Sequence, residues 1–195
     1  MMDDTKNIII VGVGGQGIIL ASEVLAEAAL LAGYDVRKSE VHGMAQRGGS
    51  VSSHVRFGKK VLSPLIELGQ ADIMLAFEKV EGLRSCEFMK RGATIIMNNA
   101  EIIPTTVSLG MGSYPSDVPG ILRGLGFNVI MVNAQDKARE AGTSKAANVV
   151  LLASLASFLG IDKEIWMEVV RHRVPKKFLD VNIAAFNLGY DSAGA

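Results

Sequence analysis

A glycine-rich turn near the start of the chain constrains the fold more than any other feature. The apolar run from Ile8 to Val11 leads into the sequence GVGGQG, residues 12–17, and a helical pattern then extends from Ile18 to Leu31. A strand, a glycine turn and a helix N-terminus in this order bring backbone N–H groups to the positive end of a helix, with no Cβ atoms to keep an anion away. The pattern therefore predicts a phosphate-binding turn.

The spacing of the glycines leaves two interpretations open. Gly12, Gly14 and Gly17 fit a dinucleotide-binding fingerprint, but two isoleucines follow the last glycine where a nucleotide-hydrolysing P-loop has Lys and Ser or Thr. The alternative is a tight turn in which the glycines serve close packing alone. Glu40 is the candidate acid for a ribose, but it comes later than the usual offset, so NAD binding is not well supported.

Apolar runs alternate with helical patterns along the chain, which indicates an α/β domain with a mostly parallel sheet. The expected strands are Asn7–Val11, Asp35–Ser39, Ile73–Phe77, Thr94–Met97 and Asn128–Val132. Residues Ser50–Phe57 alternate with period two and predict a further strand, with a hairpin tip at Gly58-Lys59-Lys60. We expect a single Rossmann-like domain over residues 1–195, with an open sheet, a hairpin insertion and a helical C-terminal third.

Helical patterns are expected at Glu78–Lys90, Lys145–Leu159, Asp162–Arg171 and Lys176–Leu188, and residues Gly110–Gly120 are expected to form a mobile surface loop. The segment 145–159 is apolar on nearly all sides. It must be buried by neighbouring helices or by another polypeptide, which favours an obligate partner or a homodimer.

Composition excludes several classes of partner and site. The chain has 20 basic and 20 acidic residues, so no global field directs it to nucleic acid or to an anionic membrane. The longest apolar stretch, Ala146–Leu159, is too short to span a bilayer. One cysteine, Cys86, cannot ligate an iron–sulfur cluster by itself and favours a cytoplasmic location; we expect it to pack rather than react. The three histidines lack paired ligand spacing, so no metal site is expected.

A second polar, glycine-rich segment, HGMAQRGGS at residues 42–50, follows the second expected strand. Ligands of open α/β sheets bind outside the carboxyl ends of the strands, so this segment should face the first turn. Gln46 and Arg47 can offer an amide and a guanidinium fork to a phosphate or carboxylate; the alternative is an ordinary connection with Arg47 in solvent. The sequence Thr143-Ser144-Lys145 favours a helix cap, with an anion contact by Lys145 as the alternative.

Taken with GVGGQG at 12–17 and Ala21-Ser22-Glu23, the run EVHGMAQRGGSV at 40–51 resembles the gamma-type subunits of 2-oxoacid:ferredoxin oxidoreductases. The form of the second segment favours the indolepyruvate branch of that family. The likeness extends over almost the whole chain, including Asn133–Ala141, Ala147-Asn148 and Pro175–Tyr190.

The resemblance implies a subunit of a cytoplasmic enzyme complex that oxidatively decarboxylates a 2-oxoacid to an acyl-CoA and reduces ferredoxin. It implies a larger alpha subunit that carries thiamine diphosphate and iron–sulfur clusters, and an association of this domain with coenzyme A. No catalytic residue is assigned in this chain. The cofactor-binding candidates are Gly12, Gly14, Gly15, Gln16 and Gly17 in the first turn, with Gln46 and Arg47 in the second segment.

Three alternatives remain at this point. The chain could serve another 2-oxoacid, namely pyruvate, 2-oxoglutarate or a branched-chain acid. It could be a stand-alone NAD(P)-dependent reductase, which requires a ribose-binding acid and a proton donor. It could also be a non-catalytic nucleotide-binding or assembly module, which requires no alpha subunit.

Overall fold

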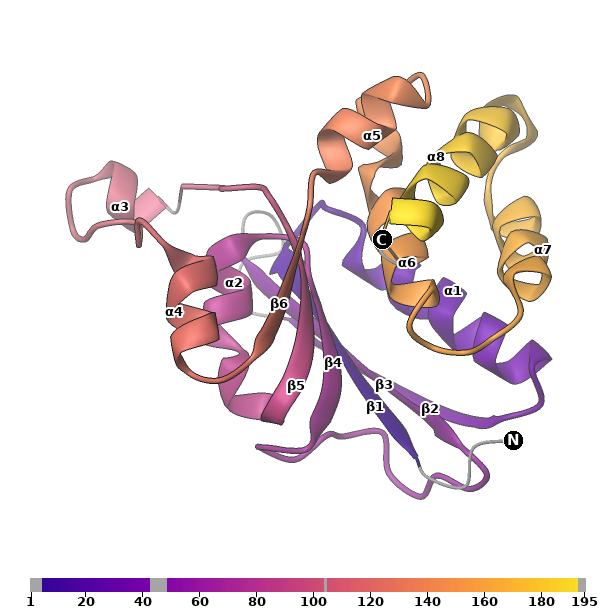
Figure 1. Cartoon of the computed structure of the whole chain (residues 1–195), viewed down its shortest axis with the longest axis horizontal. Helices are drawn as coiled ribbons and strands as arrows, with labels where there is room; N and C mark the ends of the chain where they lie inside the picture. Colours follow the sequence, from indigo (N-terminus) through magenta and orange to yellow (C-terminus); the bar gives the residue numbers. More distant parts are fainter. Residues whose placement is uncertain (1–4, 43–48, 104, 193–195) are drawn as a thin grey trace.

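The computed structural model describes residues 5–42, 49–103 and 105–192 as an α/β fold around one central sheet (Figure 1). Its strands are β1 (Lys6–Val13), β2 (Asp35–His42), β3 (Ser50–Gly58), β4 (Ala71–Ala76), β5 (Met89–Asn98) and β6 (Asn128–Val132). The longer helices are α1 (Ile18–Leu31), α6 (Ala147–Ala156), α7 (Lys163–Arg173) and α8 (Leu179–Ser192). The shorter ones are α2 (Lys79–Arg84), α3 (Thr105–Ser108), α4 (Val118–Gly124) and α5 (Ala134–Glu140), with 3-10 turns η1 (Cys86–Phe88), η2 (Ser144–Ala146) and η3 (Lys176–Phe178).

The strand order is β2-β3-β1-β4-β5-β6. The strands β1, β4, β5 and β6 are parallel neighbours, and β3 lies antiparallel between β2 and β1. The expected mostly parallel sheet with a hairpin insertion is confirmed. The expected tip at Gly58-Lys59-Lys60 is wrong, because β2 and β3 form the hairpin. After residue 60 the chain crosses to β4, which pairs in parallel with β1 and so cannot be the return strand of a hairpin.

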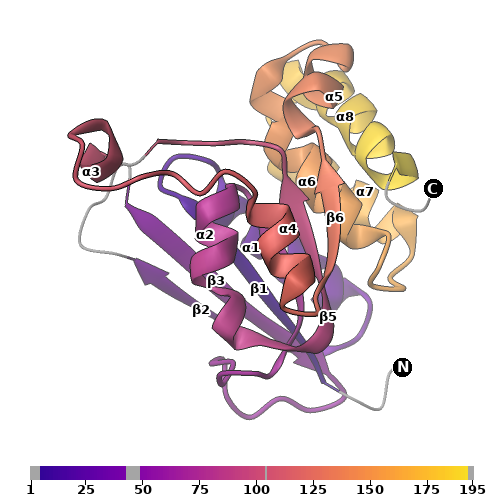
Figure 2. The ribbon, with the colours of Figure 1, turned by 60° about the vertical axis from the view of Figure 1, so that its left-hand side comes forward.

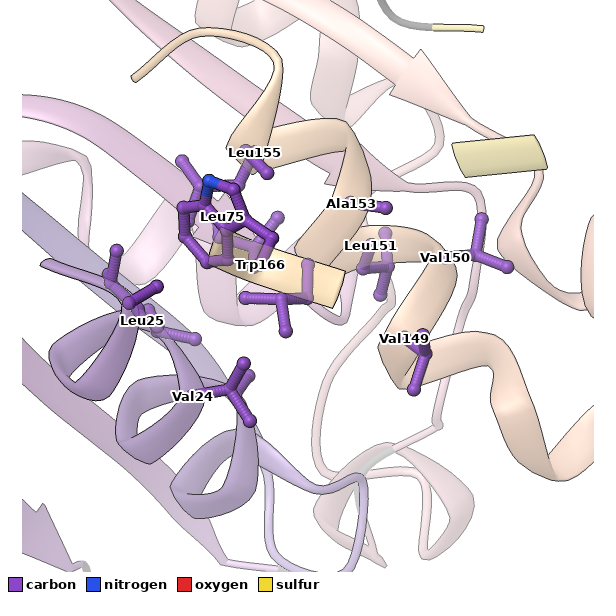
Figure 3. Packing of buried hydrophobic residues seen from close by; sticks show 14 of the residues in the cluster. Val24, Leu25, Leu75, Val149, Val150, Leu151, Ala153, Leu155 and Trp166 are labelled. Carbon is purple, nitrogen blue, oxygen red and sulfur yellow. The ribbon is translucent and has the colours of Figure 1, made fainter. Parts of the chain in front are cut away.

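Helices cover both faces of the sheet, which explains the uninterrupted apolar run in β1. Side chains alternate along a strand, so Ile8 and Ile10 join the core under α1, α6, α7 and α8, while Ile9 and Val11 join the core under α2 and α4. Figure 1 shows the sheet between the two helical layers, and Figure 2 looks onto the layer formed by α2 and α4. In the larger core, Trp166 of α7 packs among side chains of α1, α6 and β4 (Figure 3).

The apolar helix α6 is buried by its own chain. Every residue from Val149 to Ala156 is buried, and α8 approaches so closely that a Cβ on Gly189 would lie 2.3 Å from the carbonyl oxygen of Val150. The Ser154 hydroxyl donates to the carbonyls of Val150 and Gly189, at 3.1 and 3.2 Å. Neighbouring helices therefore supply the cover, and this helix gives no argument for a homodimer.

The helical C-terminal third is confirmed, whereas two other sequence-based boundaries are wrong. The expected helix Glu78–Lys90 ends at Arg84, because η1 follows and β5 already starts at Met89, which is buried and pairs with Ala71. Burial in the sheet outweighs the helical pattern there. The expected loop Gly110–Gly120 is shortened by α4, which has a proline in its first turn, where a missing N–H costs no hydrogen bond.

Candidate functional site

A cleft of about 370 Å³ lies at the carboxyl ends of the parallel strands. The turn between β1 and α1 forms one wall, and η2 with the first turns of α5 and α6 forms the other. Phe77 and Asn98, at the ends of β4 and β5, close the bottom. This is the edge at which open α/β sheets bind ligands, as the glycine pattern predicts.

The glycines of the turn have different roles. A Cβ on Gly12 would lie 2.7 Å from Gln16 Oε1 and 2.8 Å from Phe77 Cβ, so this glycine is needed for close packing beneath the turn. Gly15 and Gly17 have φ angles of 102° and 93°, which residues with a Cβ rarely adopt. A Cβ on Gly17 would meet the Asn148 side chain at 2.8 Å, but one on Gly15 would have nothing within 4 Å. Gly15 is thus where the backbone faces the open cleft.

The Gln16 side chain fastens the turn to the neighbouring strand. Its Oε1 accepts a hydrogen bond from the Val13 N–H at 2.7 Å, and its Nε2 donates to the Phe77 carbonyl at 3.2 Å. The Asn98 amide donates to the same carbonyl at 3.2 Å and accepts from the Ala134 N–H at 3.3 Å. The amide of Gln16 is therefore engaged in shaping the cleft, and its backbone is the part that a ligand can reach.

Positive potential in the cleft comes from helix ends and one lysine. The helix α1 has Gly17 as N-cap, with neither a side-chain cap nor an acidic residue in its first turn. The start of α6 lines the same cleft. Lys145 is exposed on this wall and makes no ion pair with any described residue. Two helix N-termini and a free ammonium group favour an anion such as a phosphate.

The cap and the anion contact proposed for residues 143–145 are compatible with each other. The Thr143 hydroxyl accepts from the Lys145 N–H at 3.4 Å and caps η2, while the Lys145 side chain lines the cleft. The predicted cap is confirmed, and the backbone role of the lysine leaves its ammonium group available.

The second glycine-rich segment returns to the first turn at its described end. The Gly14 N–H donates to the Gly49 carbonyl at 2.9 Å, and Val13 pairs with Ser50 across the two strands. The two loops therefore meet, as expected from their positions after β1 and β2. The candidates Gln46 and Arg47 lie outside the described residues.

Glu40, the candidate ribose ligand, is on the wrong strand for that role. The antiparallel β3 separates β2 from β1, so Glu40 sits on the edge strand rather than beside the strand that carries the glycine turn. Two strand spacings amount to about 9.5 Å. Its carboxylate pairs with the ammonium group of Lys38 at 2.6 Å. This arrangement disfavours an NAD site of the usual form.

Glu78, the second residue after β4, is only the start of an expected helix in the sequence analysis and has no functional role there, yet it is only 1% exposed. One carboxylate oxygen accepts from the Glu81 N–H at 2.9 Å and caps α2. The other accepts from the Ile102 N–H at 3.2 Å and from the Tyr114 hydroxyl at 2.5 Å. Burial and the Glu78 carboxylate raise the pKa of Tyr114 far above its usual value. An acidic residue directly after a buried strand was the available signal.

Two other titratable groups, Cys86 and His54, have pKa values shifted by burial and lie outside the cleft. Burial raises the pKa of the Cys86 thiol, which disfavours the thiolate, and the side chain packs against the core under α2 and α4, as expected. Burial lowers the pKa of His54, whose Nδ1 accepts from the Ile66 N–H at 3.1 Å. Within the described ranges, no group of three or more His, Cys, Asp or Glu side chains could hold a metal ion, and no helix there could cross a membrane.

Comparison with known proteins decides the family. The family model described as pyruvate ferredoxin/flavodoxin oxidoreductase matches residues 7–192. The chain belongs to this family. It is 43% identical over 192 residues to the indolepyruvate oxidoreductase subunit IorB of Thermococcus kodakarensis, with 96% of this chain and 95% of that protein covered. The IorB subunit of Pyrococcus horikoshii is 44% identical over 193 residues, with the same coverage.

Solved structures share the fold. The gamma subunit of a keto/oxoacid ferredoxin oxidoreductase from Geobacter sulfurreducens superposes with a TM-score of 0.72 and 26% identity, covering 96% of this chain and 98% of that one. A 2-oxoglutarate:ferredoxin oxidoreductase from Magnetococcus marinus, solved with 2-oxoglutarate, coenzyme A and succinyl-CoA bound, gives a TM-score of 0.78. Its identity is 21%, and the match covers 99% of this chain but 32% of that one, so it supports the fold alone.

Proposed function

We propose that this chain is the IorB-type subunit of an indolepyruvate ferredoxin oxidoreductase, which converts an aryl pyruvate to its acyl-CoA and reduces ferredoxin. The observation that supports this proposal is the difference in sequence identity between branches of the family. Four IorB subunits are 37% to 44% identical to this chain, whereas subunits for 2-oxoglutarate and ketoisovalerate are 27% to 29% identical. The match extends over 94% to 97% of each IorB protein, so the relatives correspond to this chain along nearly their whole length.

The chemistry of the complex requires groups that this chain does not provide. A single cysteine cannot hold an iron–sulfur cluster. In this proposal a larger alpha subunit supplies thiamine diphosphate and the clusters, and ferredoxin receives its electrons from the complex. The role of this chain is to bind and orient. The antiparallel β3 between β2 and the glycine turn argues against the stand-alone NAD(P) reductase.

In this proposal the cleft of this chain holds the diphosphate of coenzyme A. Coenzyme A supplies the thiol that accepts the acyl group. Gly15 leaves open space where a Cβ would stand, and Lys145 lies on the opposite wall without an ion-pair partner among the described residues. Backbone N–H groups at the start of α1 would hold phosphate oxygens there, with Gly14, Gly15 and Gly17 keeping the approach free of side chains. Gly12 and Gln16 would maintain the shape of the turn.

Gln46 and Arg47 remain predictions for the same site. The Gly14–Gly49 hydrogen bond brings the end of their segment to the turn. A guanidinium stays protonated at any working pH, so Arg47 would orient an anion and could not act as a general base. We expect Arg47→Lys, which keeps the charge and loses the planar fork, to weaken binding of coenzyme A or of the oxoacid about tenfold. The alpha subunit is the other possible contact of Arg47, so only unchanged binding of coenzyme A, of the oxoacid and of the alpha subunit in both Arg47→Lys and Arg47→Ala would make it a solvent-exposed loop residue.

The experiment that tests the function is purification of the native complex through a tag on this chain. The proposal expects a larger companion with thiamine diphosphate and iron–sulfur absorption, and ferredoxin reduction that depends on coenzyme A. Turnover should be faster with indolepyruvate than with pyruvate, 2-oxoglutarate or 2-oxoisovalerate. A preference for one of these other acids would move the chain to another branch of the family, and iron–sulfur absorption from the isolated chain would overturn the division of roles.

A further inference from the structure

A polypeptide arm stands out from the body at the carboxyl edge of the sheet. It consists of residues 99–103 and 105–117, between β5 and α4, and it includes α3 (Figures 1 and 2). It exposes four large apolar side chains, here called the arm patch: Ile102 (41% exposed), Ile103 (49%), Leu109 (68%) and Met111 (70%). Single exposed apolar residues are common, but four on one short projecting segment are not.

The composition of the arm is unusual for an exposed segment of its length. No residue from 102 to 116 is charged, although 21% of the whole chain is Asp, Glu, Lys or Arg. An exposed segment of this length normally carries charges of both signs for solubility. Depletion of charge together with exposed aliphatic side chains and methionine is the composition of the buried centre of an interface.

The arm is held in place by its root. The Glu78 carboxylate binds it on both sides of α3, through the N–H of Ile102 and the hydroxyl of Tyr114. The Asn99 N–H donates to the Val132 carbonyl at 2.8 Å, which ties the start of the arm to β6. The patch is therefore presented on a pre-ordered support, which lowers the entropic cost of binding a partner.

We propose that the arm patch is a docking surface for an uncharged, apolar face of the unlike subunit of the oxidoreductase; this inference rests on the proposed function. Four side chains cannot cover the roughly 800 Å² per partner of a standard interface, so the partner must continue along the carboxyl edge towards the cleft. The groups that the reaction needs and this chain lacks would enter at that edge. A second copy bound through the same edge would bring two positive clefts to one interface, which like charges disfavour.

The test uses the wild-type chain and variants titrated against the purified unlike subunit, with the dissociation constant as the readout. The double substitution Leu109→Asp with Met111→Asp should weaken subunit binding at least tenfold. Leu62→Asp is the matched control, because Leu62 is 85% exposed in the connection between β3 and β4, at the opposite edge of the sheet, and its change should stay within twofold. Circular dichroism of the isolated chains checks that each variant is folded.

The outcomes separate this inference from the proposed function. Wild-type affinity in the folded double variant overturns the docking surface, whatever the complex catalyses. Loss of a homodimer in that variant, with unlike-subunit binding unchanged, assigns the patch to a second copy and also overturns it. Should the double variant fail to fold, Met111→Ser and Leu109→Ser are measured singly against Leu62→Ser. A complex that assembles through the arm but oxidises no 2-oxoacid leaves the docking surface standing and removes the proposed function.

Discussion

The two halves of the carboxyl edge differ in what they present. On one side, the glycine turn and Lys145 offer N–H groups and a positive charge around a cleft. On the other, the arm offers four apolar side chains and no charge between residues 102 and 116. Both halves are fixed by residues just after β4, because the Phe77 carbonyl holds the turn through Gln16 while the Glu78 carboxylate holds the arm.

The difference teaches how one sheet edge can serve two kinds of recognition. An anion is held by backbone groups, which need close approach and therefore glycine. A protein face is held by buried apolar area, which needs projecting side chains on an ordered support. Substitutions in the two halves should therefore change different measured quantities, with the largest effects on stability and the smallest on the binding of an anion.

The largest effect is expected beneath the turn. Gly12→Ala places a Cβ 2.7–2.8 Å from Gln16 Oε1 and Phe77 Cβ, where the hydrogen bond from the Phe77 N–H to the Val11 carbonyl, at 2.8 Å, holds the strand ends together. Overpacking of this kind should lower the free energy of unfolding by about 3 kcal/mol. Gly15→Ala, whose Cβ meets nothing within 4 Å, should cost only about 1–2 kcal/mol from its positive φ. Urea unfolding compares the two; equal losses would contradict the division of roles between the glycines.

On the arm side, Tyr114→Phe removes the hydroxyl that reaches Glu78 and should cost about 1.5 kcal/mol near pH 7. Burial and the carboxylate raise the folded-state pKa of Tyr114 above its unfolded value of 10.0. The stabilisation is therefore complete below about pH 10 and is lost as the pH rises through the folded-state pKa. Unfolding measured from pH 7 to 11 should show the gap between wild type and variant narrowing above pH 10. A gap that widens there would mean that the phenolate is the bound form.

In the cleft, Gly15→Ala should weaken coenzyme A binding about tenfold while the chain remains folded, because the added methyl group occupies the space in front of the N–H groups. Calorimetric titration of the complex measures this. Gly33→Ala is a suitable control, since Gly33 also has a positive φ with nothing within 4 Å but lies after α1, away from the cleft. If coenzyme A binds the Gly15→Ala variant as tightly as the Gly33→Ala variant, the turn has a structural role alone.

The two halves of the edge were not equally predictable from the sequence. The strand, turn and helix around residues 8–31 follow from apolar periodicity and glycine spacing, which act locally. Residues 98–127 are less predictable. There α3 and α4 are short, their helical pattern is weak, and the anchor Glu78 is distant in sequence from Ile102 and Tyr114. Local patterns do not encode which remote backbone group a carboxylate will meet.

The cleft illustrates the same limit. The sequence indicates Gly15 and Lys145 separately, but only the packing of α6 against α1 brings their loops to one cavity. Gln16 is a candidate ligand-binding residue from the sequence, and the structure engages its amide with Val13 and Phe77, which leaves its backbone for a ligand. A residue type in a motif defines what chemistry is possible there. The surrounding backbone decides whether a side chain is left available for it.

The smallest effect is expected at Lys145, and its salt dependence sharpens the comparison between the two halves. Its ammonium group is exposed, so solvent and salt screen its attraction for a phosphate. Lys145→Gln keeps a polar side chain that is one atom shorter and removes the charge, and should weaken coenzyme A binding about fivefold, or roughly 1 kcal/mol, at low ionic strength. At about 1 M salt, where the Debye length is roughly 3 Å, wild type and variant should converge. Lys60→Gln, an exposed lysine at the opposite edge, should match wild type throughout. Docking through the arm patch, which lies in the uncharged run 102–116, should depend weakly on salt. A Lys145 effect that persists at high salt would contradict the division of charge and apolar contact between the two halves. Subunit binding that collapses at high salt would contradict it as well.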